Sequence, residues 1–389
     1  MTAQRAIDVL AVALMQFLIA ELPTLGRERD PGATEQRPAA AVWTLSPSPL
    51  TSIGGGSDPN ATVTRVVSVV RLRDDRVLLW EPRPASVRLF DAQGRFIRLF
   101  AREGSGPGEV RDARWIGVAA DTVFIFDGTQ RRLTRFHPTG DLVSTVPFGV
   151  SVGAETYTVT GRWQKGAFVL RSADAGFSGR GADGVRRDSI WVALADSAGG
   201  ALRRVVRLPG ATVFAKALSG GGVYVSALPF SASGLVAVGN DMFWIGDNSS
   251  STLLGYDQLG QLKRRVTVPF ESVPVERSVT VARRDRELET ARTSAVRSLI
   301  SEKYAVVPKT TPCYSGLAVA PDGDLWVTAF VGDDSVAPEV AIISPDGRVR
   351  ATLRLPPRFR VVQVDANAVL GIYRDEDDAE FVQIYGIRR

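Results

Sequence analysis

The sequence is poor in the residues that most enzymes use for nucleophilic, redox and metal chemistry. Its 389 residues include one cysteine, Cys313, and one histidine, His137. A single cysteine excludes an intrachain disulfide and a zinc site of several thiolates, and a single histidine excludes sites that need two or more imidazoles. A catalytic triad using His137 has no recognisable nucleophile elbow to serve it. We therefore assign no catalytic residue, no metal site and no cofactor.

These two residues have simple structural interpretations. Cys313 has no histidine near it in the sequence and is expected to pack as a small buried residue. His137 falls at the end of an expected strand, where the sibling repeats place Asp257 or Ser344, and is interpreted as a turn residue.

Long apolar runs and charge of one sign are also missing. The apolar run Val9–Ala20 is too short to span a bilayer comfortably but suits the apolar region of a signal peptide. We interpret residues 1–25 as a signal-peptide-like or N-terminal apolar segment and 26–41 as a linker; the alternative is a short helix packed on the domain. This predicts a periplasmic or secreted protein with no integral membrane span after processing.

The 47 basic residues are scattered among 42 acidic ones, so no nucleic-acid partner is expected.

A four-strand pattern recurs from about Trp43 onward. Its clearest marks are turns between an expected third and fourth strand, each with a glycine where a tight hairpin needs positive φ. Buried second strands, which carry short runs of bulky apolar residues, precede these turns. The turns are 91–94, 138–141, 196–199, 257–260 and 345–347, and the second strands are 77–80, 123–126, 243–245 and 325–327.

These marks divide the chain into repeating units of about 40 to 50 residues, the period of a propeller blade. The last unit has three strands, and the segment from Trp43 to Ile53 is predicted to supply its fourth. The predicted fold is therefore all-β: residues 42–389 form a six-bladed β-propeller of four-stranded antiparallel blades whose ring is closed by an N-terminal strand. The units are 66–100, 113–147, 157–208 with an insertion near 176–187, 234–268, 314–355 and 360–387.

One segment, about 279–302, breaks the strand pattern. Val281, Leu288, Ala291, Ala295 and Leu299 fall on one helical face with Arg and Glu elsewhere. We predict one surface helix, which is either a lid over one mouth of the ring or a packed insertion that covers an exposed patch.

Two motifs carry a resemblance to a known family. The stretch Arg102–Val110 (REGSGPGEV) matches a Gly-x-Gly-Pro-Gly-Glu loop after the first blade, and Tyr314–Val327 (YSGLAVAPDGDLWV) matches a late-blade strand, Asp-Gly turn and strand. In these, and in Trp43–Ser46 (WTLS) followed by Ile53-Gly54, the chain resembles bacterial six-bladed propellers of the NHL and TolB-like group. The resemblance covers residues 43–389 and implies the fold, but little about activity.

Binding in such a ring is expected at one mouth of the central channel. We predict five ligand-binding residues at or just before inner strands: Glu109, Arg111, Tyr157, Tyr314 and Arg360. The glycines around Glu109 are explained either by a site or by a tight inter-blade crossing in which its carboxylate accepts from backbone N–H groups. The acidic run 374–378 is interpreted as a solvated loop tip rather than a metal site.

The sequence favours a non-catalytic, extracytoplasmic β-propeller that binds a peptide, a glycan or a partner protein at one mouth of its channel. The alternative is a Ca²⁺-dependent hydrolase or lyase of the lactonase-like propeller type, whose carboxylates would converge in the channel. Metal content and the effect of a chelator on thermal stability separate the two.

Overall fold

The computed structural model describes residues 40–389 except 56–57, 150, 153–154, 164–165, 175–176, 178–182 and 201. The signal-peptide-like segment 1–25 and linker residues 26–39 lie outside the described residues. Within the described ranges, no helix is long and apolar enough to cross a membrane.

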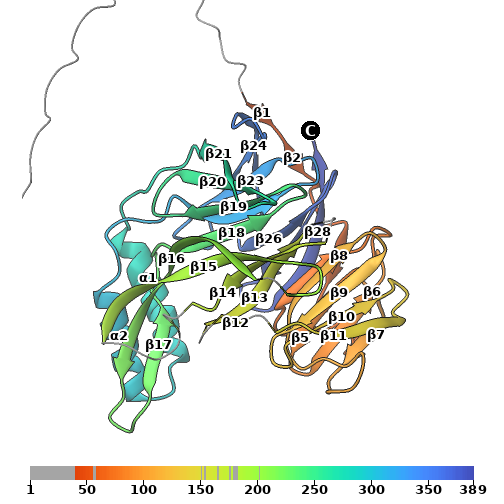
Figure 1. The fold of residues 1–389 in the computed structure, drawn as a ribbon. Coiled ribbons are helices and arrows are strands. Elements are labelled where there is room, and N and C mark those ends of the chain that lie inside the picture. The colour runs from red at the N-terminus through yellow and green to blue at the C-terminus, as the bar shows by residue number, and fades with distance from the viewer. Residues whose placement is uncertain are drawn as a thin grey trace, which may run out of the picture. The chain divides into compact units, whose positions relative to one another are not determined.

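The described chain has an all-β, propeller-type fold of antiparallel sheets that follow one another in chain order (Figure 1). The first two sheets have four strands each and occupy the predicted units 66–100 and 113–147. Their strands are β4 (Ser68–Arg71), β5 (Val77–Pro82), β6 (Ala85–Phe90) and β7 (Phe96–Arg102), then β8 (Ala113–Ala119), β9 (Thr122–Asp127), β10 (Arg132–Phe136) and β11 (Leu142–Pro147).

The third sheet is larger than predicted. It has six strands instead of four and continues beyond residue 208, because β15 and β16 pair along their whole length and β17 adds to them. Gly184–Arg187, predicted to end an insertion, is part of β15; residues 175–176 and 178–182 lie outside the described part. The strands are β12 (Ser151–Val152), β13 (Glu155–Arg162), β14 (Phe168–Ser172), β15 (Gly184–Ala195), β16 (Arg203–Ala217) and β17 (Val223–Ala227).

The fourth and fifth sheets again follow the predicted units. The short N-terminal strand β1 (Ala41–Val42) adds to the fifth sheet, parallel to β25, so this strand begins at the last residue of the predicted linker. The strands are β18 (Gly234–Val238), β19 (Met242–Asp247), β20 (Thr252–Asp257) and β21 (Leu262–Thr267), then β22 (Tyr314–Val319), β23 (Leu325–Ala329), β24 (Glu339–Ile343) and β25 (Val349–Arg354).

The last sheet joins the two ends of the described chain. It consists of β26 (Phe359–Val364), β27 (Ala368–Arg374) and β28 (Glu380–Arg388). Two N-terminal strands, β2 (Thr44–Leu45) and β3 (Thr51–Ile53), pair antiparallel with β28. The segment predicted to supply the fourth strand, residues 43–53, therefore pairs where the sequence indicated.

The core lies between successive sheets. The second strands are buried on both faces because alternate residues face different neighbours: Leu78 and Trp80 pack toward the second sheet, whereas Val77 and Leu79 pack toward the last. This explains why second strands are short continuous apolar runs rather than alternating ones. The first strands contact one another in the order β4, β8, β13, β18, β22 and β26, and β26 also contacts β4.

The predicted third-to-fourth strand turns are confirmed. Each contains a glycine with a φ between 68° and 93°, in the left-handed region where other residues are strained. The glycines are Gly94, Gly140, Gly199, Gly260 and Gly347. His137 lies in the second of these turns, directly after β10, as predicted.

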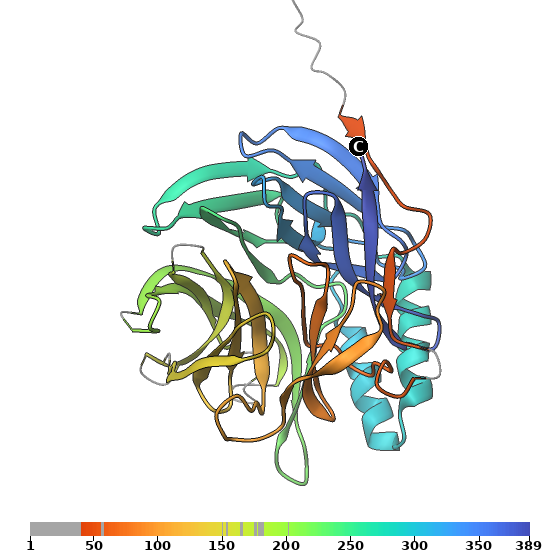
Figure 2. The same ribbon diagram turned by 90° about the vertical axis from the view of Figure 1, so that its right-hand side faces the viewer.

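The insertion predicted as one helix consists of two, α1 (Arg277–Thr290) and α2 (Ser294–Ala305), which lie side by side (Figure 2). The break between the two helices follows from how α1 ends and how α2 is capped at its start. Ala291 ends α1 in an extended conformation, and the Thr293 hydroxyl accepts from the Val296 N–H, which begins α2. Lys216 at the end of β16 pairs with Glu302 of α2 (3.1 Å) and joins this hairpin to the third sheet.

Candidate binding cavity

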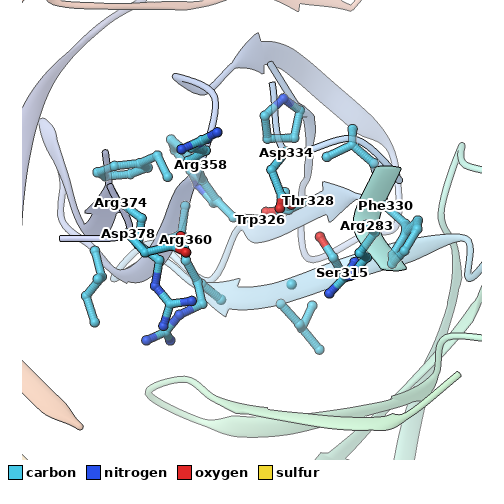
Figure 3. Close-up of a pocket in the computed structure, with 18 residues that line it drawn as sticks. Arg283, Ser315, Trp326, Thr328, Phe330, Asp334, Arg358, Arg360, Arg374 and Asp378 are labelled. Carbon is cyan, nitrogen blue, oxygen red and sulfur yellow. The ribbon is translucent and has the colours of Figure 1, made fainter. Parts of the chain in front are cut away.

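A cavity of about 380 Å³ lies between the first strands of the last two sheets (Figure 3). Its walls come from β22 and β23 on one side and from β26 and β27 on the other. Loops 330–338 and 375–379, which follow the second strands of these sheets, and helix α1 contribute the rest. The lining residues are Arg283, Ser315, Gly316, Leu317, Ala318, Trp326, Thr328, Phe330, Val331, Asp334, Pro338, Arg358, Phe359, Arg360, Val361, Ile372, Arg374 and Asp378.

Irregular pairing of the two first strands shapes this cavity. The register shifts between Tyr314 and Gly316 in β22, and between Val361 and Gln363 in β26. Such bulges bend a strand and change where its side chains point. Leu317 and Val361 are only partly buried, and both line the cavity.

The side of the cavity formed by the last sheet is cationic. Arg374 forms a two-pronged ion pair with Glu380, at 2.7 and 3.1 Å. Arg358 donates to the Asp375 carbonyl at 2.5 Å, and its charge is among the causes that lower the pKa of Asp333. The Glu380 carboxylate also accepts from the Val66 N–H at 2.6 Å, so it helps to hold the connection into β4.

Arg360 is the cation most available to a ligand. Among the described residues, no hydrogen bond or ion pair engages its side chain, which is open to the cavity. Burial among the surrounding groups lowers the pKa of Arg360; the Glu380 charge opposes this change and the Arg374 charge adds to it. An exposed guanidinium that forms no ion pair of its own is free to pair with an incoming anion.

The opposite side of the cavity also carries a cation, Arg283 of helix α1. The guanidinium of Arg283 stacks over Phe230, 5.4 Å from the ring centre. Asp334 on this side pairs with Arg286 at 3.6 Å. Figure 3 shows Arg283 beside Phe330 and Ser315, across the cavity from the arginines of the last sheet.

The five predicted binding residues, all of them described, do not gather in one place. Arg360 alone among them lines the cavity. The Glu109 carboxylate accepts from the Gly106 N–H (2.8 Å) and from Arg102 (2.9 Å), and these two contacts lower its pKa. It therefore supports its own glycine-rich loop, as the crossing interpretation predicted. Arg111 is exposed beside that loop, and its backbone N–H donates to Asp127.

The two predicted tyrosines belong to the core. Tyr157 is 5% exposed, and its hydroxyl contacts Glu155 and Arg204 at the edge of the third sheet. Tyr314 is fully buried at the start of β22, directly before the register shift. Neither side chain is presented to the cavity.

Acidic and amide side chains at the ends of second strands hold backbone rather than a metal ion. Glu81 accepts from the Thr64 N–H at 2.6 Å, and Asp127 accepts from the Arg111 N–H at the same distance. Asn248 accepts from the Ser233 N–H, also at 2.6 Å. Each contact fixes the connection that enters the same sheet's first strand. Across the described part of the chain, no three His, Cys, Asp or Glu side chains gather as ligands of a metal ion would.

Sequence reasoning missed most of the cavity. Arg283 belongs to the segment predicted as a helix, but nothing in the sequence indicates which helix residue reaches the sheets. Arg358 was detectable by its position, since it lies two residues before Arg360 at the start of an expected strand. The acidic run 374–378, interpreted as a solvated loop tip, lies at the end of the second strand of the last sheet, and its Asp378 lines the cavity.

Comparisons with known proteins support the fold. No protein-family model matches the sequence, and no curated protein is significantly similar to it. A solved member of the DUF4221 family from Bacteroides vulgatus is similar in structure, with a TM-score of 0.52 and 10% identity over 90% of this chain and 99% of that one. A gluconolactonase from Xanthomonas campestris aligns with a TM-score of 0.45 and 11% identity over 83% of this chain and 86% of that one. The similarity to the DUF4221 family member concerns the propeller-type fold alone.

Proposed function

We propose that the protein is a six-bladed β-propeller whose ring is closed by the N-terminal strands, and that it binds a ligand with an acidic group in the cavity between β22 and β26 without catalysing a reaction. The contact of β26 with β4 and the pairing of β2 and β3 with β28 support the closed ring. The uncompensated guanidinium of Arg360 in the cavity is the observation that carries the ligand class.

The charges that line the cavity support an anion. Four arginines, Arg283, Arg358, Arg360 and Arg374, face two aspartates, Asp334 and Asp378. Two charged residues outside the lining pair with lining residues: Glu380 with Arg374 and Arg286 with Asp334. Their opposite charges offset each other, so the cavity keeps more positive than negative charge. The apolar run at residues 9–20 supports a periplasmic or secreted location, where a peptide, a glycan or a protein would present such an acidic group.

Substitution of the central cation tests this function. We expect acetate, benzoate, octanoate or inorganic phosphate to raise the melting temperature saturably. Arg360→Gln should weaken binding about 10- to 100-fold, the worth of a charge-assisted hydrogen bond. The matched control is Arg348→Gln, because Arg348 lies on an exposed turn. Equal binding by wild type and Arg360→Gln would refute the proposal.

The alternative, a Ca²⁺-dependent hydrolase or lyase, is separated by metal analysis. The proposed function expects purified protein without stoichiometric Ca²⁺ and a melting temperature that a chelator leaves unchanged. Copurified Ca²⁺ with a chelator-induced fall in melting temperature would instead favour the metal-dependent enzyme.

A further inference from the structure

We propose that the preferred ligand is a linear diacid: one carboxylate binds at Arg360 and Arg358, an apolar chain crosses the middle of the cavity, and a second carboxylate binds at Arg283 of helix α1. This inference rests on the proposed function and adds the second acid and the spacing between the two.

The cationic groups come from two different parts of the fold. Arg358 and Arg360 lie at the start of β26, whereas Arg283 lies in the middle of α1. In Figure 3 they stand at opposite sides of the cavity, with Trp326 and Thr328 between them. A ligand with a single acidic group would satisfy one side and leave the other guanidinium without an anion.

Each end carries a guanidinium that, among the described residues, forms no ion pair within 4 Å. At the first end, Glu380 is engaged by Arg374, which leaves Arg360 and Arg358. At the second end, Asp285 pairs with Arg284 at 2.8 Å. Glu287 pairs with Lys303 at 2.5 Å and accepts from the Tyr304 hydroxyl at 2.7 Å. In the described chain no ion pair within 4 Å joins Arg283 to a carboxylate.

Apolar side chains form part of the cavity lining. Leu317, Ala318 and Ile372 line the cavity from both sheets, together with the largely buried Trp326. The nearby Ser315 hydroxyl already donates to the Ala329 carbonyl at 3.1 Å. A polar linker would find few partners here, whereas a methylene chain loses nothing by leaving water.

The two aspartates limit which ligands fit. Asp334 is engaged by Arg286, so it does not cancel Arg283. Asp378 is exposed on the loop after β27 and stands on the same side as Arg374. Its charge disfavours ligands whose acidic groups are crowded together at one end, and so favours two separated carboxylates.

A dicarboxylate series tests the spacing. Affinities of the α,ω-dicarboxylates from glutarate to sebacate are measured by calorimetry beside the monocarboxylate of each chain length. We expect one diacid length to bind best, about 10-fold more tightly than its monoacid, since the second charge-assisted contact adds roughly 1.4 kcal/mol.

Variants of the two ends make the assignment specific. Arg283→Gln should reduce the best diacid to the affinity of its monoacid and leave the monoacid unchanged. Arg360→Gln should weaken both. Arg284→Gln is the matched helix control, because Arg284 pairs with Asp285 instead (2.8 Å). Arg283→Lys keeps the charge and should retain part of the diacid preference, which guards against loss of folding in the glutamine variant.

The possible failures are distinguishable. Equal binding of diacids and monoacids, both weakened by Arg360→Gln, overturns the diacid inference and leaves the proposed function standing. A diacid preference that survives Arg283→Gln also overturns it. Absence of binding by every acid in the series overturns both.

Discussion

Two buried tyrosines differ in what their hydroxyl groups contact. The Tyr304 hydroxyl donates to Glu287, whereas the Tyr314 hydroxyl has no hydrogen-bond partner among the described residues. Tyr314 fits because Gly246 faces it: a Cβ there would lie 2.0 Å from the hydroxyl oxygen. Burial raises the pKa of both tyrosines well above its usual value.

This contrast predicts opposite effects of removing the hydroxyl. Tyr314→Phe should leave the free energy of unfolding unchanged or raise it by up to about 1 kcal/mol, because it removes an unpaired buried polar group. Tyr304→Phe should lower it by about 1 to 2 kcal/mol, because a charge-assisted hydrogen bond is lost. Urea denaturation of the two variants measures both. A clear loss of stability in Tyr314→Phe would mean that its hydroxyl has a partner.

At the same scale, the direction of side chains limited prediction of the site. Tyr314 and Arg360 were placed correctly at the start of inner strands. Tyr314 directly precedes a register shift and is fully buried, and no residue pattern shows where a strand will bulge. Arg360 precedes the shift in its own strand and stays open to the cavity.

At the scale of elements, the hairpin of β15 and β16 is anchored to the neighbouring sheet. Arg187 of β15 forms a two-pronged ion pair with Asp247 at the end of β19, at 2.6 and 3.1 Å. Burial raises the pKa of Asp247, but the contacts with Arg187 and the Ser249 N–H outweigh it and lower the pKa below its usual value.

The lowered pKa of Asp247 predicts how this anchor responds to pH. A carboxyl with a lower pKa in the folded state stabilises the protein above its unfolded value, 3.8, and loses that contribution as the pH falls through the folded value. Asp247→Asn should therefore cost about 1 to 2 kcal/mol at neutral pH, and the cost should shrink in acid. Urea denaturation at both pH values checks this. The control, Asp285→Asn, changes an exposed pair and should cost little at either pH.

Elements with strong local signals were predictable, and those that depend on a pairing partner or on a single capping residue were not. Turn glycines such as Gly94 and Gly140 need positive φ whatever surrounds them, so their positions marked the hairpins. The great length of β15 and β16 depends on their pairing with each other, and the break between α1 and α2 depends on one cap at Thr293. Neither the strand length nor the helix break alters the spacing of apolar residues along the sequence, which is the signal used to predict strands and helices.

At the scale of the whole described chain, the packing of Trp43 connects its two ends. Trp43 is 6% exposed, its ring lies 6.3 Å from that of Trp326, and its backbone N–H donates to the Thr352 carbonyl. Arg389 stacks over the same ring, 4.7 Å from its centre. The sequence predicted this junction because the last unit lacked a strand and the segment 43–53 offered one.

Removal of this side chain should destabilise the whole structure. Trp43→Ala is expected to lower the free energy of unfolding by about 3 to 5 kcal/mol, the usual cost of deleting a large buried aromatic side chain. Trp43→Phe should recover part of the loss. Thermal melts followed by circular dichroism measure both. If Trp43→Ala melted like wild type, the junction would contribute little to stability.

The pairing of β2 with β28 also determines how the structure responds to mechanical load. Thr44 lies opposite Arg388 and Leu45 opposite Ile387, so the two strands run antiparallel and separate from the same end. Traction on the two ends of the described chain would load these backbone hydrogen bonds one after another, as in opening a zipper, rather than all at once in shear. The pairing of β2 with β28 is thus loaded in its mechanically weaker direction.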